Sequence, residues 1–262
     1  MSNELEVKGS ALRVDRLCLS FGGLTVLSDV SFDVSPGGVL GIVGSNGSGK
    51  TSLLNCVSGI YSPHSGSIYL DREEITRLSP HKVTRRGIAR TFQHIEIPLD
   101  LKVVDLAMLG RQAITRSSML YFGIGIPFLR ALEKESRKAA LDSIALLGLT
   151  EHANTLVGDL PYGLAKQADI ARAVAQQPRV LLLDEPAAGL NEEERNDLAG
   201  LISQLTSTNL TIILVEHDMD FISKVCTEVV VMEQGQRIFR GAIGDALEDQ
   251  AVIESLLGGR IT

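Results

Sequence analysis

A glycine-rich run followed by lysine and threonine is the part of this sequence best suited to chemistry on phosphates. Residues 44–51 read GSNGSGKT and fit the pattern G-x-x-x-x-G-K-[ST]. Glycines at these positions let backbone N–H groups turn towards an anion at the positive end of the following helix. Lys50 is expected to lie along the β- and γ-phosphates of a nucleotide, and Thr51 to bind Mg²⁺. The residues expected to line this site are Ser45, Asn46, Gly47, Ser48, Gly49, Lys50, Thr51 and Ser52.

Acidic residues and a histidine follow two aliphatic runs further along the chain. Asp184 and Glu185 follow one such run, and Glu216-His217-Asp218 follows another, Thr211–Val215. Both runs read as buried parallel strands, whose carboxyl ends meet at one edge of the sheet, where ligands bind. Asp184 is then expected to hold the water shell of Mg²⁺, and Glu185 to orient or deprotonate the attacking water. His217 is a candidate contact to the γ-phosphate, although a histidine in this position can also be a simple polar cap.

Two further residues have open interpretations on the local sequence. Phe21 precedes two glycines at a predicted turn, where an aromatic ring either stacks on a nucleotide base or covers a small core. Gln93 ends a predicted strand, Ile88–Phe92, and is either a solvated loop amide or a residue that touches both Mg²⁺ and the attacking water.

The elements that must position these residues are those of an α/β chain. The apolar run Val39–Val43 predicts a strand buried on both faces, followed by a helix after the phosphate-binding loop. Residues 11–34 alternate as two antiparallel strands. Residues 101–149 have helical periodicity, with an amphipathic helix Ala131–Leu147 that ends at Gly148. Other predicted elements are a strand Ser65–Leu70, helices Gln167–Ala175, Glu192–Leu205 and Ala251–Leu257, and a hairpin around Gln234-Gly235.

The composition favours a single α/β domain and argues against several other classes of protein. The 262 residues are 44% hydrophobic, which suits one large α/β domain. A net charge of −7, without clustered basic residues, argues against nucleic acid as a partner. Three separated cysteines form neither a disulfide framework nor a metal-binding spacing. The longest apolar run, Met119–Leu129, is too short and too rich in glycine to span a bilayer, and reads either as internal packing or as a surface for a membrane or partner.

The ordered set of motifs resembles the nucleotide-binding subunit of the ATP-binding cassette family, from about Leu12 to Gly258. The matching elements are an aromatic turn (Phe21), Walker A (Gly44–Thr51), the Q-loop (Gln93), a signature segment (Leu160–Leu164), Walker B (Val180–Asp184), Glu185, a D-loop (Ala188–Asn191) and the switch histidine (His217). The resemblance implies a P-loop NTPase (RecA-like) core with an antiparallel β subdomain and an inserted α-helical subdomain. The domain would span about 11–259, with core parts at about 11–98 and 178–259 and the helical part at about 99–177.

The resemblance also implies function. It predicts an ATPase that uses ATP and Mg²⁺ and is peripheral on the cytoplasmic face of the cell membrane. Two such subunits would dimerise head to tail, so that Tyr162 and Gly163 of one signature contact the ATP of the other. Transmembrane permease subunits and, indirectly, a solute-binding protein would be partners. Finer features, including Arg90-Thr91-Phe92-Gln93-His94, are similar to branched-chain amino acid importer ATPases. The alternatives are a urea or amide importer, a soluble cassette ATPase, and a regulator that binds ATP without turnover.

Two departures from the family pattern affect the expected site. The family signature is Leu-Ser-Gly-Gly-Gln, whereas this chain has Pro161 and Leu164 at the serine and glutamine positions, and Asn191 replaces the D-loop aspartate. A hydrogen bond to a charged group contributes about 1.5 to 3 kcal/mol. Loss of the serine is therefore expected to slow or weaken the composite site by roughly ten- to a hundredfold.

Overall fold

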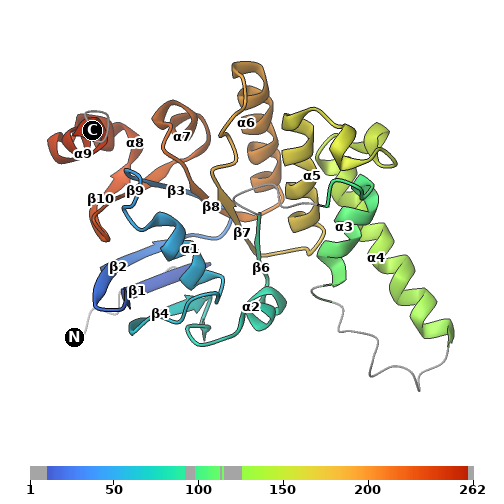
Figure 1. The fold of residues 1–262 in the computed structure, drawn as a ribbon, viewed down its shortest axis with the longest axis horizontal. Helices are drawn as coiled ribbons and strands as arrows, with labels where there is room; N and C mark the ends of the chain where they lie inside the picture. The colour runs from blue at the N-terminus through green and yellow to red at the C-terminus, as the bar shows by residue number, and fades with distance from the viewer. Residues whose placement is uncertain (1–10, 92–97, 113, 115–125, 259–262) are drawn as a thin grey trace, which may run out of the picture.

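The computed structural model describes residues 11–91, 98–112, 114 and 126–258, and within them the chain forms two sheets and a set of helices (Figure 1). The larger sheet consists of β3 (Val39–Val43), β6 (Ile88–Arg90), β7 (Val180–Asp184), β8 (Thr211–Val215), β9 (Glu228–Glu233) and β10 (Gln236–Ala242). The smaller, antiparallel sheet consists of β1 (Leu12–Phe21), β2 (Leu24–Val34), β4 (Ser65–Leu70) and β5 (Glu73–Glu74).

The larger sheet is parallel where the predicted site lies. Its strand order is β10-β9-β3-β8-β7-β6, and all neighbours are parallel except β10 with β9. Val215 of β8 pairs with Asp184 of β7 on one side and with Ile42 of β3 on the other. The carboxyl ends of these three strands therefore lie at the same level, on one edge of the sheet.

The aliphatic side chains of the central strands divide between two cores. In β7, Val180 and Leu182 join the core that contains α1 (Lys50–Val57) and the antiparallel sheet. Leu181 and Leu183 join a second core on the opposite face, which contains residues of α3 (Val103–Gln112), α5 (Tyr162–Val174) and α6 (Glu192–Ser207). The alternation follows from the two-residue period of a strand, and it explains why these strands are aliphatic throughout. Figure 1 shows α1 between the two sheets.

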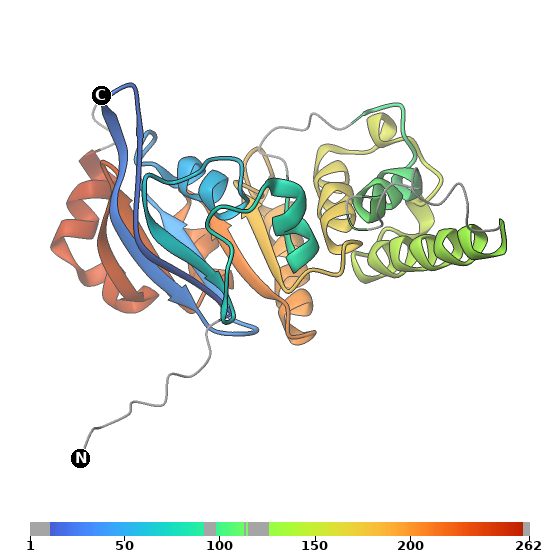
Figure 2. The same cartoon turned by 90° about the horizontal axis from the view of Figure 1, so that it is seen from below.

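Helices cover the second face and extend beyond the sheet as a helical lobe, which lies on the right in Figures 1 and 2. The lobe consists of α3 (Val103–Gln112), α4 (Ile126–Leu146) and α5 (Tyr162–Val174), with the short 3-10 helices Thr150–His152 and Val157–Asp159. The remaining helices are α2 (Pro80–Arg86), α6 (Glu192–Ser207), α7 (Met219–Val225), α8 (Ile243–Glu248) and α9 (Gln250–Gly258). A Cβ on Gly110 would lie 2.0 Å from the carbonyl oxygen of Arg172, so glycine allows α3 to approach α5. None of the helices in the described parts of the chain is both long and apolar enough to cross a bilayer.

Several element boundaries differ from the sequence-based predictions. Strands Ser65–Leu70 and Thr211–Val215 have the predicted bounds. The helix predicted from Gln167 instead begins at Tyr162, directly after Pro161, whose φ of −52° suits a helix start, and Ala165 packs its first turns into the core. The helix predicted from Ala131 begins at Ile126, and the strand Ile88–Phe92 ends at Arg90. Local periodicity does not reveal these ends, because packing and hydrogen bonds to distant segments set them.

Candidate nucleotide site

The phosphate-binding loop joins β3 to α1, and glycines occupy positions where a side chain would not fit. A Cβ on Gly44 would lie 2.2 Å from the carbonyl oxygen of Met232. Gly49 has a φ of 99°, and a Cβ there would lie 2.9 Å from Leu27 Cδ2. Within the described structure no side chain caps the first turn of α1, which begins at Lys50. The backbone N–H groups of that turn are therefore available to an anion, which a helix N-terminus attracts.

The side chain of Lys50 is buried against its own loop. Its Nζ donates hydrogen bonds to the carbonyl oxygens of Gly44 at 2.7 Å and Ser45 at 2.8 Å. The other predicted loop residues are exposed (Asn46, Gly47), half-buried (Ser45, Thr51, Ser52) or buried (Ser48). The loop thus presents backbone and hydroxyl groups around a cation, which is the composition that a polyphosphate site requires.

Three carboxylates at the ends of β7 and β8 act on the Lys50 cation. Burial lowers the pKa of Lys50, while the negative charges of Glu185, Asp184 and Glu216 oppose that change. The parallel register explains how residues so far apart in sequence come together, because each one ends a strand at this edge or comes directly after such a strand. The predicted lysine and the two predicted carboxylates therefore share one electrostatic environment.

Asp184 is held by an ion pair with Arg90, the last residue of β6. The Asp184 side chain is fully buried, and Arg90 Nη2 donates to its Oδ2 at 2.7 Å. Arg90 Nη1 also donates to Asn55 Oδ1 at 2.6 Å, which connects the pair to α1. The other carboxylate oxygen, Oδ1, is buried and receives no hydrogen bond from any described residue. Asp184 therefore has one oxygen held by the protein and one that needs a partner.

The unpartnered oxygen of Asp184 fits the predicted Mg²⁺ site. A buried polar atom without a partner is costly, and an oxygen-seeking cation or its water shell would satisfy it. Thr51, in the first turn of α1, supplies a hydroxyl. Mg²⁺ is usually bound through one or two protein oxygens together with substrate phosphates and water. The donor set of Asp184 and Thr51 suits that mode of binding.

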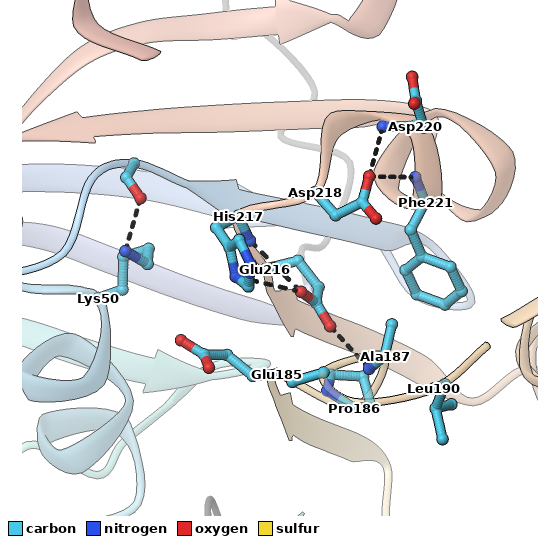
Figure 3. A network of polar contacts seen from close by, with 12 residues as sticks. Lys50, Glu185, Pro186, Ala187, Leu190, Glu216, His217, Asp218, Asp220 and Phe221 are labelled. Atoms are coloured by element: carbon cyan, nitrogen blue, oxygen red, sulfur yellow. Dashed lines mark hydrogen bonds and ion pairs between the residues drawn. The ribbon is translucent and has the colours of Figure 1, made fainter. Parts of the chain in front are cut away.

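Glu185 begins the turn between β7 and α6. Its backbone is in the left-handed region, with a φ of 47°, and its N–H donates to the carbonyl of Val215 at 2.9 Å. Figure 3 shows its carboxylate pointing to the side of the site on which Lys50 lies. A carboxylate in this position can accept a proton from water that attacks a phosphate bound at Lys50.

Glu216 connects the turn after β7 to His217 (Figure 3). Its Oε1 accepts a hydrogen bond from Ala187 N–H at 2.7 Å, and its Oε2 accepts one from His217 N–H at 3.3 Å. His217 Nδ1 lies 3.8 Å from the same Oε2, and the imidazole side chain is 59% exposed. Burial raises the pKa of Glu216, against the effect of these hydrogen bonds. The buried Glu216 thus fixes the backbone of His217 while its ring remains accessible.

The signature segment packs against the D-loop and the start of α6. Tyr162 is 50% exposed, and a Cβ on Gly189 would lie 3.0 Å from its Cε1. A Cβ on Gly163 would lie 2.7 Å from Glu194 Oε1, so the start of α5 lies close to the side chain of Glu194. Asn191 caps α6, because its Oδ1 accepts the N–H of Glu194 at 3.0 Å and its own N–H donates to Glu194 Oε2 at 2.9 Å. Asparagine therefore fills the N-cap position as an aspartate would.

Phe21 lies at the end of β1 and contacts a second aromatic ring. Its centroid is 5.1 Å from that of Tyr61, with an edge-to-face angle of 73°. The Phe21 side chain nevertheless remains 47% exposed. The ring therefore both covers Tyr61 and retains area that a base can stack on, so both predicted roles are compatible with its placement.

Two predicted features lie wholly or largely outside the described residues. Gln93 belongs to the segment 92–97, and most of the apolar run Met119–Leu129 belongs to the segment 115–125. The end of that run falls in the first turn of α4, which starts at Ile126.

Three side chains that hold the site together have no role in the sequence-based prediction. They are Arg90, which pairs with Asp184, Glu216, which binds the turn after β7, and Lys166, which binds the same turn from α5. Arg90 and Glu216 stand at or just after strand ends, where charged residues face a ligand edge. That signal was available in the sequence, but the pairing of each residue with a segment far along the chain was not.

The chain is similar to known proteins along most of its length. The family model described as ABC transporter matches residues 27–188. The high-affinity branched-chain amino acid transport ATP-binding protein BraF of Pseudomonas aeruginosa is 37% identical over 248 residues, covering 94% of this chain and 97% of BraF. The corresponding protein LivG of Escherichia coli is 33% identical with the same coverage. A crystal structure of an ATP-binding cassette of an ABC transporter in its ADP conformation superposes with a TM-score of 0.84 at 29% identity, covering 95% of this chain and 99% of that one.

Proposed function

We propose, since this chain belongs to the ABC transporter family and is an ATPase, that it powers a branched-chain amino acid importer. The observation that carries the mechanism is the meeting of Lys50, Asp184, Glu185 and His217 at one edge of the sheet. The solute is proposed because BraF and LivG carry that function in their names and align along nearly the whole chain.

Each predicted site residue has a proposed task. Lys50 and the N–H groups of α1 would bind the β- and γ-phosphates, and the face of Phe21 would stack on the adenine. Glu185 would accept the proton of the attacking water, and His217 would contact the γ-phosphate. Asp184, Thr51 and Gln93 would hold Mg²⁺, which when bound neutralises phosphate charge. The loop residues Ser45, Asn46, Gly47, Ser48, Gly49 and Ser52 would complete the phosphate cradle.

The chain is proposed to function as one subunit of a dimer of cassettes. It would dimerise head to tail with a second cassette, so that Tyr162 and Gly163 serve the partner's ATP. Permease subunits would hold the pair at the inner face of the cell membrane, and a solute-binding protein would act through them. We also propose that residues of about 99–177 form the helical part of one cassette domain, with about 11–98 and 178–259 as its core.

Replacing Glu185 with glutamine tests the catalytic assignment. The variant should bind Mg-ATP with unchanged affinity by calorimetry, because the phosphate-binding groups remain. Its steady-state hydrolysis should fall by about 10²- to 10⁴-fold, the usual contribution of a general base. Glu193→Gln is the matched control, since Glu193 is exposed on the first turn of α6. Turnover by Glu185→Gln at the rate of this control would rule out Glu185 as the catalytic carboxylate.

The solute is tested with the chain assembled with permease subunits and a solute-binding protein. Hydrolysis in proteoliposomes should be stimulated by binding protein loaded with leucine, isoleucine or valine. If binding protein loaded with urea or a short amide stimulates hydrolysis and binding protein loaded with these amino acids does not, the proposed solute is wrong. A chain that sediments with membranes whether or not the permease subunits are present would contradict the importer assignment.

A further inference from the structure

The turn that carries Glu185 is held by a lysine from the signature helix. Lys166, in the second turn of α5, donates from Nζ to the backbone carbonyl oxygens of Glu185 at 3.1 Å, Pro186 at 3.0 Å and Ala188 at 2.6 Å. An ammonium has three N–H donors, so all of them are used on this one turn. The Lys166 side chain is half-buried, and this burial lowers its pKa, while the charges of Glu216 and Glu185 oppose the change.

The same turn is held from its other side by a carboxylate. Glu216, after β8, accepts the N–H of Ala187 at 2.7 Å (Figure 3). The carbonyl groups of the turn therefore face a cation and its central N–H faces an anion, which matches the sign of each backbone dipole. Two oppositely charged side chains from different elements thus hold the backbone of four consecutive residues, 185–188.

The turn that Lys166 and Glu216 bind begins with Glu185, whose backbone is strained. Glu185 has a φ of 47°, a region that non-glycine residues rarely adopt because Cβ approaches the backbone. Such a conformation persists where surrounding contacts over-determine it, and here the direction of the Glu185 carboxylate depends on it. Lys166 contributes directly, because one of its three acceptors is the carbonyl of Glu185 itself.

Lys166 also touches the segment proposed to serve the partner subunit. Its Nζ lies 5.2 Å from the centre of the Tyr162 ring, within reach of a cation–π contact. Tyr162 in turn packs on the turn at Gly189, where a Cβ would lie 3.0 Å from the ring. One cation therefore joins the signature residue, the D-loop turn and the backbone of Glu185 within a single chain.

We propose that Lys166 is a positioning residue for hydrolysis, which holds Glu185 in its working direction and connects it to the signature helix of the same chain. A signature segment that moves on contact with the partner's ATP would then shift the turn, and with it the Glu185 carboxylate. The inference rests on the catalytic role proposed for Glu185, because positioning this turn affects hydrolysis only if the turn carries a catalytic group.

The test compares Lys166→Met with Lys166→Arg in the chain assembled with its partner subunits. Methionine keeps the length and apolar stem but removes the donors, whereas the guanidinium of arginine offers five N–H groups to the same carbonyls. Lys166→Met should lower kcat by about 10- to 100-fold, the usual effect of a small misplacement of a catalytic group. Its KM for ATP and its calorimetric affinity for Mg-ATP should stay unchanged, and Lys166→Arg should recover most of the loss.

Lys138→Met is the matched control, because Lys138 is an exposed lysine of α4 that pairs with Asp142 away from the site. A Lys166→Met variant that turns over like this control, or one that loses ATP affinity and thermal stability together with kcat, would overturn the proposal. An arginine variant as slow as the methionine variant would also overturn it. The Glu185→Gln variant separates the two proposals: if it is inactive while Lys166→Met is normal, the catalytic assignment survives and the positioning role does not.

Discussion

Replacing Arg90 with methionine should destabilise the protein strongly, because it leaves the Asp184 carboxylate buried without its counter-ion. The two side chains are 15% and 0% exposed, and Arg90 Nη2 lies 2.7 Å from Asp184 Oδ2. Removal of one partner from a buried ion pair costs about 3–5 kcal/mol, since the remaining charge stays desolvated. At about 2–4 °C per kcal/mol for a chain of this size, the thermal midpoint should fall by roughly 6–20 °C.

Circular dichroism in the far ultraviolet is the suitable assay, because the chain contains no tryptophan. Arg86→Met is the matched control: its ion pair with Glu73 is exposed, at 41% and 48%, and such pairs contribute about 0–1 kcal/mol. Adding Asp184→Asn to Arg90→Met should recover part of the loss, because a neutral amide needs no counter-ion, with a coupling energy of about 0.5–3 kcal/mol. The reasoning is refuted if Arg90→Met has the same thermal midpoint as Arg86→Met. It is also refuted if the loss of unfolding free energy in the double variant equals the sum of the losses in the two single variants.

Three further predictions concern the site and its partner. Lys50→Ala should abolish ATP binding in calorimetry, because its ammonium neutralises phosphate charge in a dry site, and normal affinity would contradict the assignment. Glu216 has a raised pKa in the folded state, so above its ordinary value of 4.5 the folded protein binds more protons than the unfolded one. Wild-type stability relative to Glu216→Gln should therefore decrease as pH rises above 4.5, with Glu185 and His217 as the neighbouring charged groups. Urea unfolding that gave the opposite slope would exclude this role. Pro161→Ser should accelerate the partner's ATP site by roughly ten- to a hundredfold, the value of one hydrogen bond to a charged group. Single-site turnover in dimers with one catalytic glutamate blocked measures this, and an absence of gain would mean that backbone N–H groups suffice.

Much of the fold is determined by the sequence through local chemistry. The glycines of the phosphate-binding loop, with a lysine at the start of the next helix, specify a strand–turn–helix unit because only that backbone accommodates them. The aliphatic runs Val180–Leu183 and Thr211–Val215 specify strands buried on both faces, and the structure places both in the central sheet. Parallel pairing then requires that whatever follows them meets at one edge, which is why candidate site residues were recognisable before their neighbours were known.

Only the tertiary structure decided how those residues are held. Arg90 meets Asp184 across a sequence separation of 94 residues, Glu216 meets Ala187 across 29, and Lys166 reaches the turn of Glu185 from 19 to 22 residues away. The early start of α5 at Tyr162, which brings Lys166 to that turn, also depends on packing that helical periodicity does not encode. A charged side chain reveals from sequence that it needs a partner, because burying it alone is costly, but the partner is chosen by which strands and helices become neighbours in space.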